Sequence, residues 1–485
     1  MEYRTIQAGG HHVSPHQRGI EPEQSHNPVS LSGCIRNPER NTIAYETTVF
    51  LTQQKSEVAI SIFERRESQV QSYARSFPVV FDKAQGAILT DEKGNVFIDF
   101  LAGAGSLNYG HNDPDMRDAL VEYLGSGGIT HGLDMHTRAK AAFLDAFETH
   151  ILKPRDMDYV LQFTGPTGAN AVEAALKLAR KAKGRSNIIS FTNGFHGVTL
   201  GALAATGNEH HRGAAGVDMP GGTAMPYDGY LGKDTDSTEY LDRVLGDPSS
   251  GVDLPAAVIV ECVQGEGGLT AARMEWLQNL EKVCRKHDVL LIVDDIQAGC
   301  GRTGTFFSFE PAGIKPDMVT LSKSLSGFGL PFAVTLINRD LDIWEPGEHN
   351  GTFRGNNHAF VTATTAIEKF WKDESFANSV KDKGEKLRKG FEAIQKNCAE
   401  HVVELRGRGM MRGIVVKSGD LAGRIVEESF KRGLVIETSG AHGEVVKCLA
   451  SLTITDEELD RGLEILGQAF AVAINAENPD LIAAE

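Results

Sequence analysis

The chain has 485 residues, 41% of them hydrophobic, and this length exceeds the size at which one core usually divides into two or more domains. Its formal net charge of −16, without a long basic run, argues against a nucleic-acid partner. The six cysteines lie far apart and form no CxxC pair, so neither a metal site nor a disulfide framework is predicted. No segment resembles a signal peptide or a membrane span, and we expect a cytoplasmic protein that does not bind membranes.

The N-terminal region divides into two parts. Residues 1–55 are rich in His, Pro, Gly, Ser, Asn and Gln and are predicted to form a weakly ordered extension. Residues 56–77 have the pattern of a helix, and the next segment predicts a β-hairpin that turns at Lys93-Gly94. Residues 56–105 are therefore expected to begin a small α+β domain.

The middle of the chain alternates short apolar runs with helical patterns, which predicts a mostly parallel sheet covered on both faces. The runs span residues 159–163, 187–191, 256–261, 289–295 and 317–323. One intervening helix is marked by apolar residues at helical spacing, namely Val172, Ala175, Leu176 and Ala179. We expect residues 106–345 to form the large domain, residues 346–475 to complete the small domain, and residues 476–485 to form a tail.

Ligands of such sheets bind at the carboxyl ends of the strands. Gly165 and Gly168 follow the first run and precede a helix, whose free amide groups favour binding of a phosphate. The alternative is that this glycine loop only starts the helix and binds no ligand. Asp294 and Asp295 end the fourth run. Because side chains alternate along a strand, only one of the two is expected in a shared site, and a helix cap or a surface acid is the alternative.

Lys323 closes the fifth run and is the third polar residue at this edge. Burial or a neighbouring cation would lower its pKa and provide a neutral amine, although a lysine there can also extend into water. A pyridoxal phosphate enzyme requires three such groups: a lysine for the aldehyde, a carboxylate for the pyridinium nitrogen and a helix N-terminus for the phosphate.

Four segments in order resemble the class III (subgroup II) aminotransferases, and the resemblance spans roughly residues 58–475. They read "VIVECVQGEGG", "LLIVDDIQAGCGRTG", "LSKSLSGFGLP" and "NGTFRGNN". The resemblance implies the α/β fold type I of pyridoxal phosphate-dependent transferases, with a large domain around a mostly parallel sheet and a smaller α+β domain from both chain ends. It also implies pyridoxal 5'-phosphate as cofactor and a homodimer, or a higher homo-oligomer, with shared active sites.

The resemblance assigns cofactor contacts to particular residues. Lys323 would bind the aldehyde covalently and later move a proton, and Asp294 would pair with the pyridinium nitrogen. The remaining contacts are Gln297 to the phenolic oxygen, Ile296 beneath the ring, Phe195 on its other face with His196 beside it, Thr167, Gly168 and Ala169 at the phosphate, and Thr352 from the neighbouring subunit. The family usually has serine, glycine and threonine where this chain has Thr167, Gly168 and Ala169, so one hydroxyl contact differs.

Further segments, among them "FTNGFHGVTLGALAATGN" and "EVVKCLASLTITDEEL", resemble the branch of the family that serves ectoine biosynthesis. That branch transfers the amino group of L-glutamate to L-aspartate 4-semialdehyde by a ping-pong route. Glu266 would swing over a substrate-binding cation, and Lys447 stands where the wider family has arginine. Arg354 is a further candidate for a substrate carboxylate, and a contact between subunits is an equally open interpretation of it.

Two other functions remain open. A sibling enzyme would act on ornithine, acetylornithine or 4-aminobutyrate. A non-catalytic regulator would keep the cofactor fold, but such proteins carry a DNA-binding module, and residues 1–55 show no basic helix-turn-helix pattern.

Overall fold

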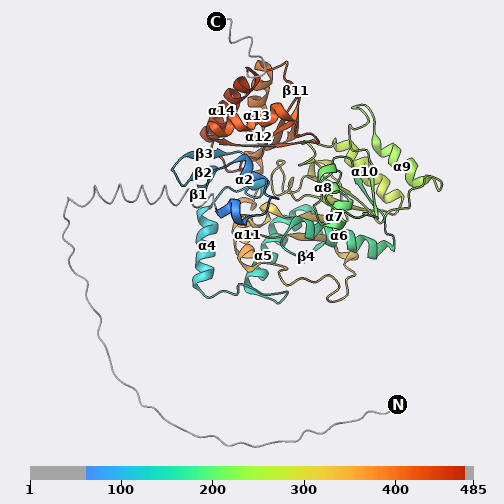
Figure 1. Cartoon of the computed structure of the whole chain (residues 1–485). Helices are drawn as coiled ribbons and strands as arrows, with labels where there is room; N and C mark the ends of the chain where they lie inside the picture. Colours follow the sequence, from blue (N-terminus) through green and yellow to red (C-terminus); the bar gives the residue numbers. More distant parts are fainter. Residues whose placement is uncertain (1–61, 476–485) are drawn as a thin grey trace, which may run out of the picture. The chain divides into compact units, whose positions relative to one another are not determined.

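The strands of the molecule form three sheets in this computed structural model, which describes residues 62–475 (Figure 1). The predicted extension at 1–55 and tail at 476–485 lie outside the described residues. Within the described residues, every helix is too short or too polar to cross a lipid bilayer. The cysteines described there, Cys262, Cys284, Cys300, Cys398 and Cys448, are free thiols.

The largest sheet has seven strands in the order β4-β10-β9-β8-β7-β5-β6. Only β10 (Val334–Asn338) runs antiparallel to its neighbours, so the sheet is mostly parallel as predicted. The five predicted runs correspond to β4 (Tyr159–Phe163), β5 (Ile188–Phe191), β7 (Ala257–Val260), β8 (Leu290–Asp294) and β9 (Met318–Leu321). The edge strand β6 (Gly222–Met225) was not predicted, because only its last residue is buried.

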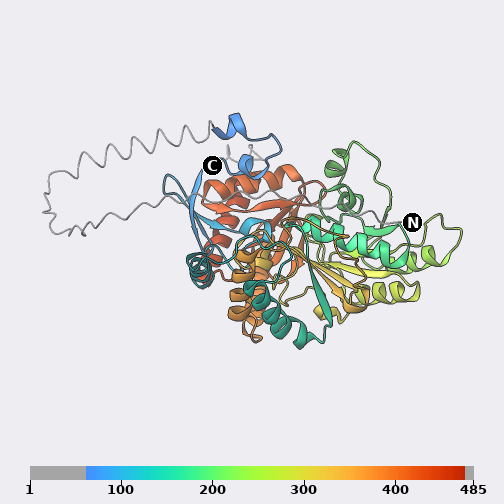
Figure 2. The ribbon, with the colours of Figure 1, turned by 90° about the horizontal axis from the view of Figure 1, so that it is seen from below.

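Helices cover both faces of this sheet because alternate strand residues are apolar on both sides. On one face Ile188, Ala257 and Ile259 pack against α6 (Gly168–Lys183). On the other face Ile189, Val258 and Leu291 pack with α10 (Met274–Lys286). Figures 1 and 2 show the two helices on opposite sides of the strands. The predicted apolar stripe of α6 is confirmed, since all four of its residues are fully buried.

One of the two smaller sheets joins both ends of the described chain, and the other, β11-β12-β15-β14, comes from the C-terminal part alone. The first has the order β1-β2-β3-β13, in which β13 (Leu434–Val435) pairs in parallel with β3 (Val96–Asp99). The blue N-terminal strands accordingly lie beside the orange-red C-terminal helices in both ribbon views. The other strands of these sheets are β1 (Phe81–Gln85), β2 (Ile88–Asp91), β11 (Val402–Arg408), β12 (Met411–Val416), β14 (Glu437–Ser439) and β15 (Val445–Cys448).

The region before the hairpin differs from its prediction. Instead of one helix over 56–77, the described part is helical at 62–66 and again in α2 (Tyr73–Ser76). Between them Val70 N donates to Ser68 Oγ at 3.4 Å, a local hydrogen bond that competes with the helix. The predicted turn is confirmed, because the side chain of Asp91 accepts from Lys93 N and Asn95 N.

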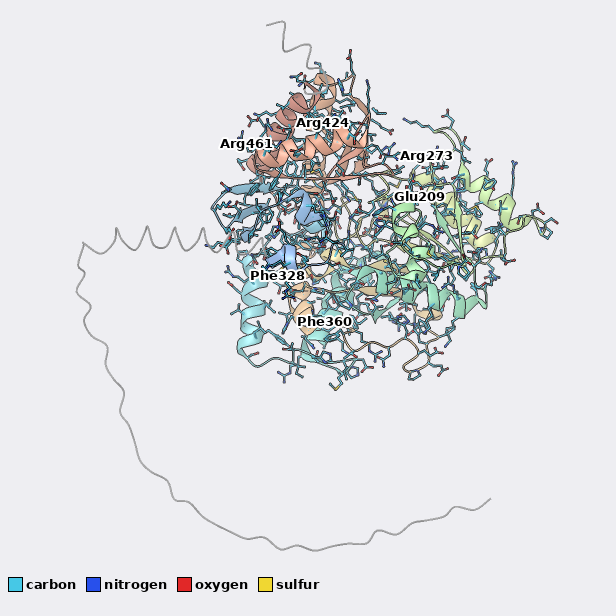
Figure 3. The ribbon with its side chains drawn as sticks, viewed as in Figure 1. Glu209, Arg273, Phe328, Phe360, Arg424 and Arg461 are labelled. Carbon is cyan, nitrogen blue, oxygen red and sulfur yellow. The ribbon has the colours of Figure 1, made fainter. Side chains whose placement is uncertain are left out.

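The other helices surround these sheets. In Figure 3, Phe360 lies on α11 (Asn357–Phe370), where its ring packs against Phe143, Phe163 and Phe332. The division between the large and small domains stays a prediction. The remaining helices are α3 (Ala102–Gly105), α4 (Pro114–Gly125), α5 (Arg138–Phe147), α7 (Leu200–Ala204), α8 (Glu209–Gly213), α9 (Ser237–Gly246), α12 (Ser375–Asn397), α13 (Gly419–Lys431) and α14 (Asp456–Asn475).

Candidate active site

A cavity of about 370 Å³ lies where β8, β9 and the start of α6 meet. Its position at the carboxyl ends of parallel strands is the one expected for a ligand. The lining includes Thr167, Gly168, Ala169, Phe195, His196, Glu266, Asp294, Ile296, Gln297 and Lys323, which are ten of the residues selected from the sequence. Five segments that are distant in the sequence therefore meet in one pocket.

Asp294 is the last residue of β8 and is held in place by three donors. Its Oδ1 accepts from Thr320 Oγ1 at 3.0 Å and from Ile296 N at 3.2 Å, and its Oδ2 lies 2.7 Å from His196 Nδ1. Burial lowers the pKa of His196, but the hydrogen bond to Asp294 and its charge outweigh burial, so the pKa is raised. A fixed carboxylate thus faces the cavity with an imidazole behind it.

The neighbouring Asp295 points away from this cavity, as the alternation of side chains predicts. It is almost fully buried, and its Oδ2 accepts from Ser308 N at 2.9 Å. Burial raises the pKa of Asp295 to about 7, above its ordinary value of 3.8. The two adjacent aspartates therefore have different environments, and only Asp294 lines the site.

Lys323 begins the short 3-10 helix η5 (Lys323–Ser326), two residues after β9 ends, instead of closing the strand. Its φ of 48° lies in the left-handed region, which costs a non-glycine residue on the order of 1–3 kcal/mol. Its Nζ donates to Ala104 O at 2.9 Å. Burial lowers the pKa of Lys323, and the charge of Lys447 acts in the same direction. A lowered pKa is the direction that a nucleophilic lysine needs.

The start of α6 provides a place for an anion. Thr167 caps the helix in an extended conformation, and its Oγ1 donates to Asn170 Oδ1 at 2.9 Å. The amides of Gly168 and Ala169 belong to the first turn, where no helical carbonyl can accept from them. A Cβ on Gly168 would lie 2.9 Å from Ile296 Cδ1, so glycine leaves room for that side chain beneath the cavity.

Lys447 lies behind the cavity and is fully buried. Its Nζ lies 2.9 Å from Glu266 Oε1 and 3.0 Å from Glu437 Oε1. Burial lowers the pKa of Lys447, but the charges of Glu266 and Glu437 outweigh it and raise the pKa, so the ammonium form is favoured. Burial raises the pKa of Glu266, but the opposite effect of the Lys447 charge is stronger. The pKa of Glu266 is therefore lowered from 4.5 to about 2. The structure thus brings together the two residues expected to form a switch.

Two predicted residues lie outside the cavity in this chain. Thr352 is exposed, and Arg354 Nη2 is bonded to Asp134 Oδ2. Their proposed contacts, from a neighbouring subunit and to a substrate carboxylate respectively, stay predictions.

Glu261 is a lining residue that the sequence interpretation missed. It is buried, and its carboxylate accepts from Phe195 N at 2.9 Å and from Gly265 N at 3.1 Å. Burial raises the pKa of Glu261 to about 7. Because Glu261 directly follows β7, the rule that points to residues at strand ends could have found it.

The family model for class-III aminotransferases matches residues 70–470. The chain belongs to this family. It is 59% identical over 408 residues to a diaminobutyrate–2-oxoglutarate transaminase of Halomonas elongata, with 84% of this chain and 97% of the relative covered. It is 57% identical over 421 residues to the enzyme of the same name from Bordetella parapertussis, with 87% and 97% covered. A solved ornithine aminotransferase of Toxoplasma gondii has a TM-score of 0.76 at 28% identity, with 90% of this chain and 99% of that chain covered.

Membership of the class-III aminotransferases implies pyridoxal 5'-phosphate as cofactor, and the cavity fits it. An anion site, a lysine with a lowered pKa and a buried carboxylate surround the same space. Gln297 Oε1 is buried there without a hydrogen-bond partner, although Nε2 of the same side chain donates to Ala104 O at 3.0 Å. The amides of Gly168 and Ala169 would hold the phosphate, Asp294 the ring nitrogen and Lys323 the aldehyde.

Proposed function

We propose that the protein is a diaminobutyrate–2-oxoglutarate transaminase. It transfers the amino group of L-glutamate to L-aspartate 4-semialdehyde and yields 2-oxoglutarate and L-2,4-diaminobutyrate. The observation that carries this proposal is identity of 57–59% over 97% of the length of relatives with that name. The ornithine aminotransferase of similar fold is only 28% identical.

When bound, pyridoxal 5'-phosphate supplies an aldehyde that accepts amino groups and a ring that withdraws electrons. The protein's own residues position the reactants and move protons. Lys323 Nζ, whose pKa is lowered by burial, takes a proton from the reacting carbon and returns it. Asp294, supported by His196, holds negative charge at the far end of the cavity. Ile296 and Phe195 line the space and exclude water from it.

Glu266 and Lys447 allow one site to bind two different substrates. Glutamate has a carboxylate beside its reacting carbon, whereas the aldehyde end of aspartate semialdehyde has none. With the semialdehyde, Glu266 stays paired with Lys447, as in the structure. With glutamate, the substrate carboxylate takes the place of Glu266 on Lys447, which binds it as a point charge instead of the two-pronged grip of arginine.

The proposal includes a homodimer in the reducing cytoplasm, with a place in ectoine biosynthesis. Exposure of Thr352 supports the dimer, because a residue that reaches a neighbouring site must lie on the surface of its own chain. The free thiols of the described cysteines support a reducing compartment.

A comparison of amino donors tests the proposal. The purified protein is assayed with 2-oxoglutarate and each of L-2,4-diaminobutyrate, L-ornithine, N-acetylornithine and 4-aminobutyrate. We expect the highest kcat/KM with diaminobutyrate. A clear preference for ornithine or acetylornithine would replace this function by that of a sibling enzyme.

A further inference from the structure

Glu437 faces the active site from the small sheet. It belongs to β14 and lies directly opposite Lys447 of β15 in the register of the hairpin. Its side chain lines a second cavity of about 710 Å³, which shares Phe195, Glu266 and Lys323 with the cofactor cavity. A substrate that reacts at Lys323 therefore extends toward Glu437.

The contacts of Glu437 leave a negative charge beside this cavity. Glu437 Oε1 and Glu266 Oε1 lie 3.0 Å and 2.9 Å from the same ammonium group of Lys447. Two carboxylates thus share one cation, and the formal charge of the three side chains is −1. The hydroxyl of Tyr73 donates a hydrogen bond to Glu437 Oε2 at 3.1 Å. Because the hydroxyl is uncharged, it does not change the net charge of −1. Because Glu437 and Lys447 are buried, water screens the excess charge poorly.

The other charged groups of the cavity do not neutralise it. The guanidinium of Arg75 hydrogen-bonds the carbonyls of Gln69 and Gln71 at 3.2 Å and 3.0 Å and is exposed, so water screens its positive charge. Lys323 is the residue that would bind the cofactor aldehyde covalently, so its amine does not pair with Glu437. Glu427 is exposed and pairs with Lys431 at 2.8 Å. A cationic group of the substrate beside Glu437 would therefore balance the two carboxylates that share Lys447.

We propose that Glu437 selects the substrate by binding a second ammonium group, the one that does not react. The inference rests on the proposed function. While the 4-amino group of L-2,4-diaminobutyrate reacts near Lys323, its 2-ammonium group lies two carbons away and forms a charge-assisted hydrogen bond with Glu437. The 2-ammonium group of aspartate semialdehyde occupies the same place. Glutamate has no second ammonium group and does not need this contact.

A matched pair of amines isolates the contact, because 4-aminobutyrate is diaminobutyrate without the 2-ammonium group. The ratio of kcat/KM for diaminobutyrate to kcat/KM for 4-aminobutyrate is measured for wild type and for Glu437→Gln. We expect the substitution to lower this ratio about tenfold or more. The kcat/KM for diaminobutyrate should fall about tenfold more than the kcat/KM for glutamate, which has no second ammonium group. If 4-aminobutyrate reacts too slowly, its competitive inhibition constant replaces its kcat/KM.

Two further variants control the experiment. Glu427→Gln removes an exposed carboxylate of the same cavity and should change the ratio by less than about threefold, because water screens its charge. Glu437→Asp keeps the charge but shortens the side chain, and an intermediate ratio is expected. This variant also tests the proposal if Glu437→Gln fails to fold, as judged by its thermal unfolding.

The outcomes separate this inference from the proposed function. A wild-type enzyme that does not use diaminobutyrate overturns the proposed function. A wild-type enzyme that prefers diaminobutyrate, with an unchanged ratio in the Glu437 variants, overturns only the role of Glu437. Equal losses for diaminobutyrate, 4-aminobutyrate and glutamate would also overturn that role, because they would mean that Glu437 merely holds Lys447.

Discussion

Asp294 and Asp295 are adjacent in the sequence, but the structure gives them opposite surroundings. Asp294 is bonded to His196 and faces the cavity, whereas Asp295 is buried on the other side with one oxygen that lacks a hydrogen-bond partner. The same substitution, Asp to Asn, should therefore affect activity at one position and stability at the other.

Asp295→Asn is expected to stabilise the protein at alkaline pH. Burial raises the pKa of Asp295 to about 7 in the folded chain, against an ordinary value of 3.8. A raised pKa means that the folded state holds a proton that the unfolded state has lost, so this contribution to stability is present below about pH 4 and is lost as the pH rises through 7. Removing the buried charge should raise the free energy of unfolding by on the order of 3 kcal/mol at pH 8.

Thermal unfolding of wild type and Asp295→Asn between pH 5.5 and 8.5 checks this expectation. The difference in Tm should widen as the pH rises. A constant difference, or a variant that is less stable at pH 8, would contradict the buried charge.

Asp294→Asn is expected to leave the fold intact and to lower kcat by about 10²–10⁴. The amide is neutral, so it removes the charge that raises the pKa of His196 and that would pair with the cofactor's ring nitrogen. Single-turnover rates with glutamate measure the loss. Asp295→Asn is the matched control and should keep kcat near the wild-type value.

Lys323→Ala should abolish both transfer of the amino group and the visible absorbance of covalently held cofactor. No other described lysine shares the cavity with Asp294, so no neighbouring amine replaces it. The absorbance spectrum before and after addition of diaminobutyrate, together with turnover, provides the measurement. Lys93→Ala, at the exposed hairpin turn, is the control. Retained activity in Lys323→Ala would refute its role.

At the level of elements, the start of α6 combines a helix cap with close packing. The first turn can bind a phosphate only while Ile296 keeps its place beneath Gly168. Gly168→Ala should therefore weaken pyridoxal 5'-phosphate binding about tenfold, because the new methyl group displaces Ile296, while alanine suits the helix itself. Titration of the cofactor-free protein gives the Kd, and Gly125→Ala, where a Cβ has open space around it, is the control. An unchanged Kd would mean that Ile296 adapts at no cost.

The elements that the sequence predicted are those with a strong local pattern. β5, β7, β8 and β9 are short, fully buried strands, and β4 is partly buried. All five appear in the sequence as apolar runs, and the end of the fourth run located Asp294. The partnership of Lys447 with Glu437 depends on the register of the hairpin between β14 and β15, which no periodicity reveals. Likewise, His196 meets Asp294 only because β5 and β8 lie in one sheet.

At the level of the whole molecule, Arg302 connects three distant parts of the chain. It is fully buried and donates to Asn108 Oδ1 at 2.5 Å, to Ala450 O at 2.5 Å and to Met410 O at 3.4 Å. None of these acceptors is a carboxylate, and burial lowers the pKa of Arg302 to about 10. The sequence did not suggest this role, because the acceptors come from segments before and after the large sheet.

Arg302→Met should destabilise the whole described unit. The apolar side chain has a similar length but leaves the oxygens of Asn108, Met410 and Ala450 without a donor, and each buried group left unpaired costs about 1–3 kcal/mol. We expect the free energy of unfolding to fall by about 3 kcal/mol or more, measured by denaturant titration. Arg339→Met removes an exposed arginine that pairs with Asp158 at 2.9 Å and should change the free energy by less than about 1 kcal/mol. Equal effects of the two substitutions would mean that Arg302 does not hold these segments together.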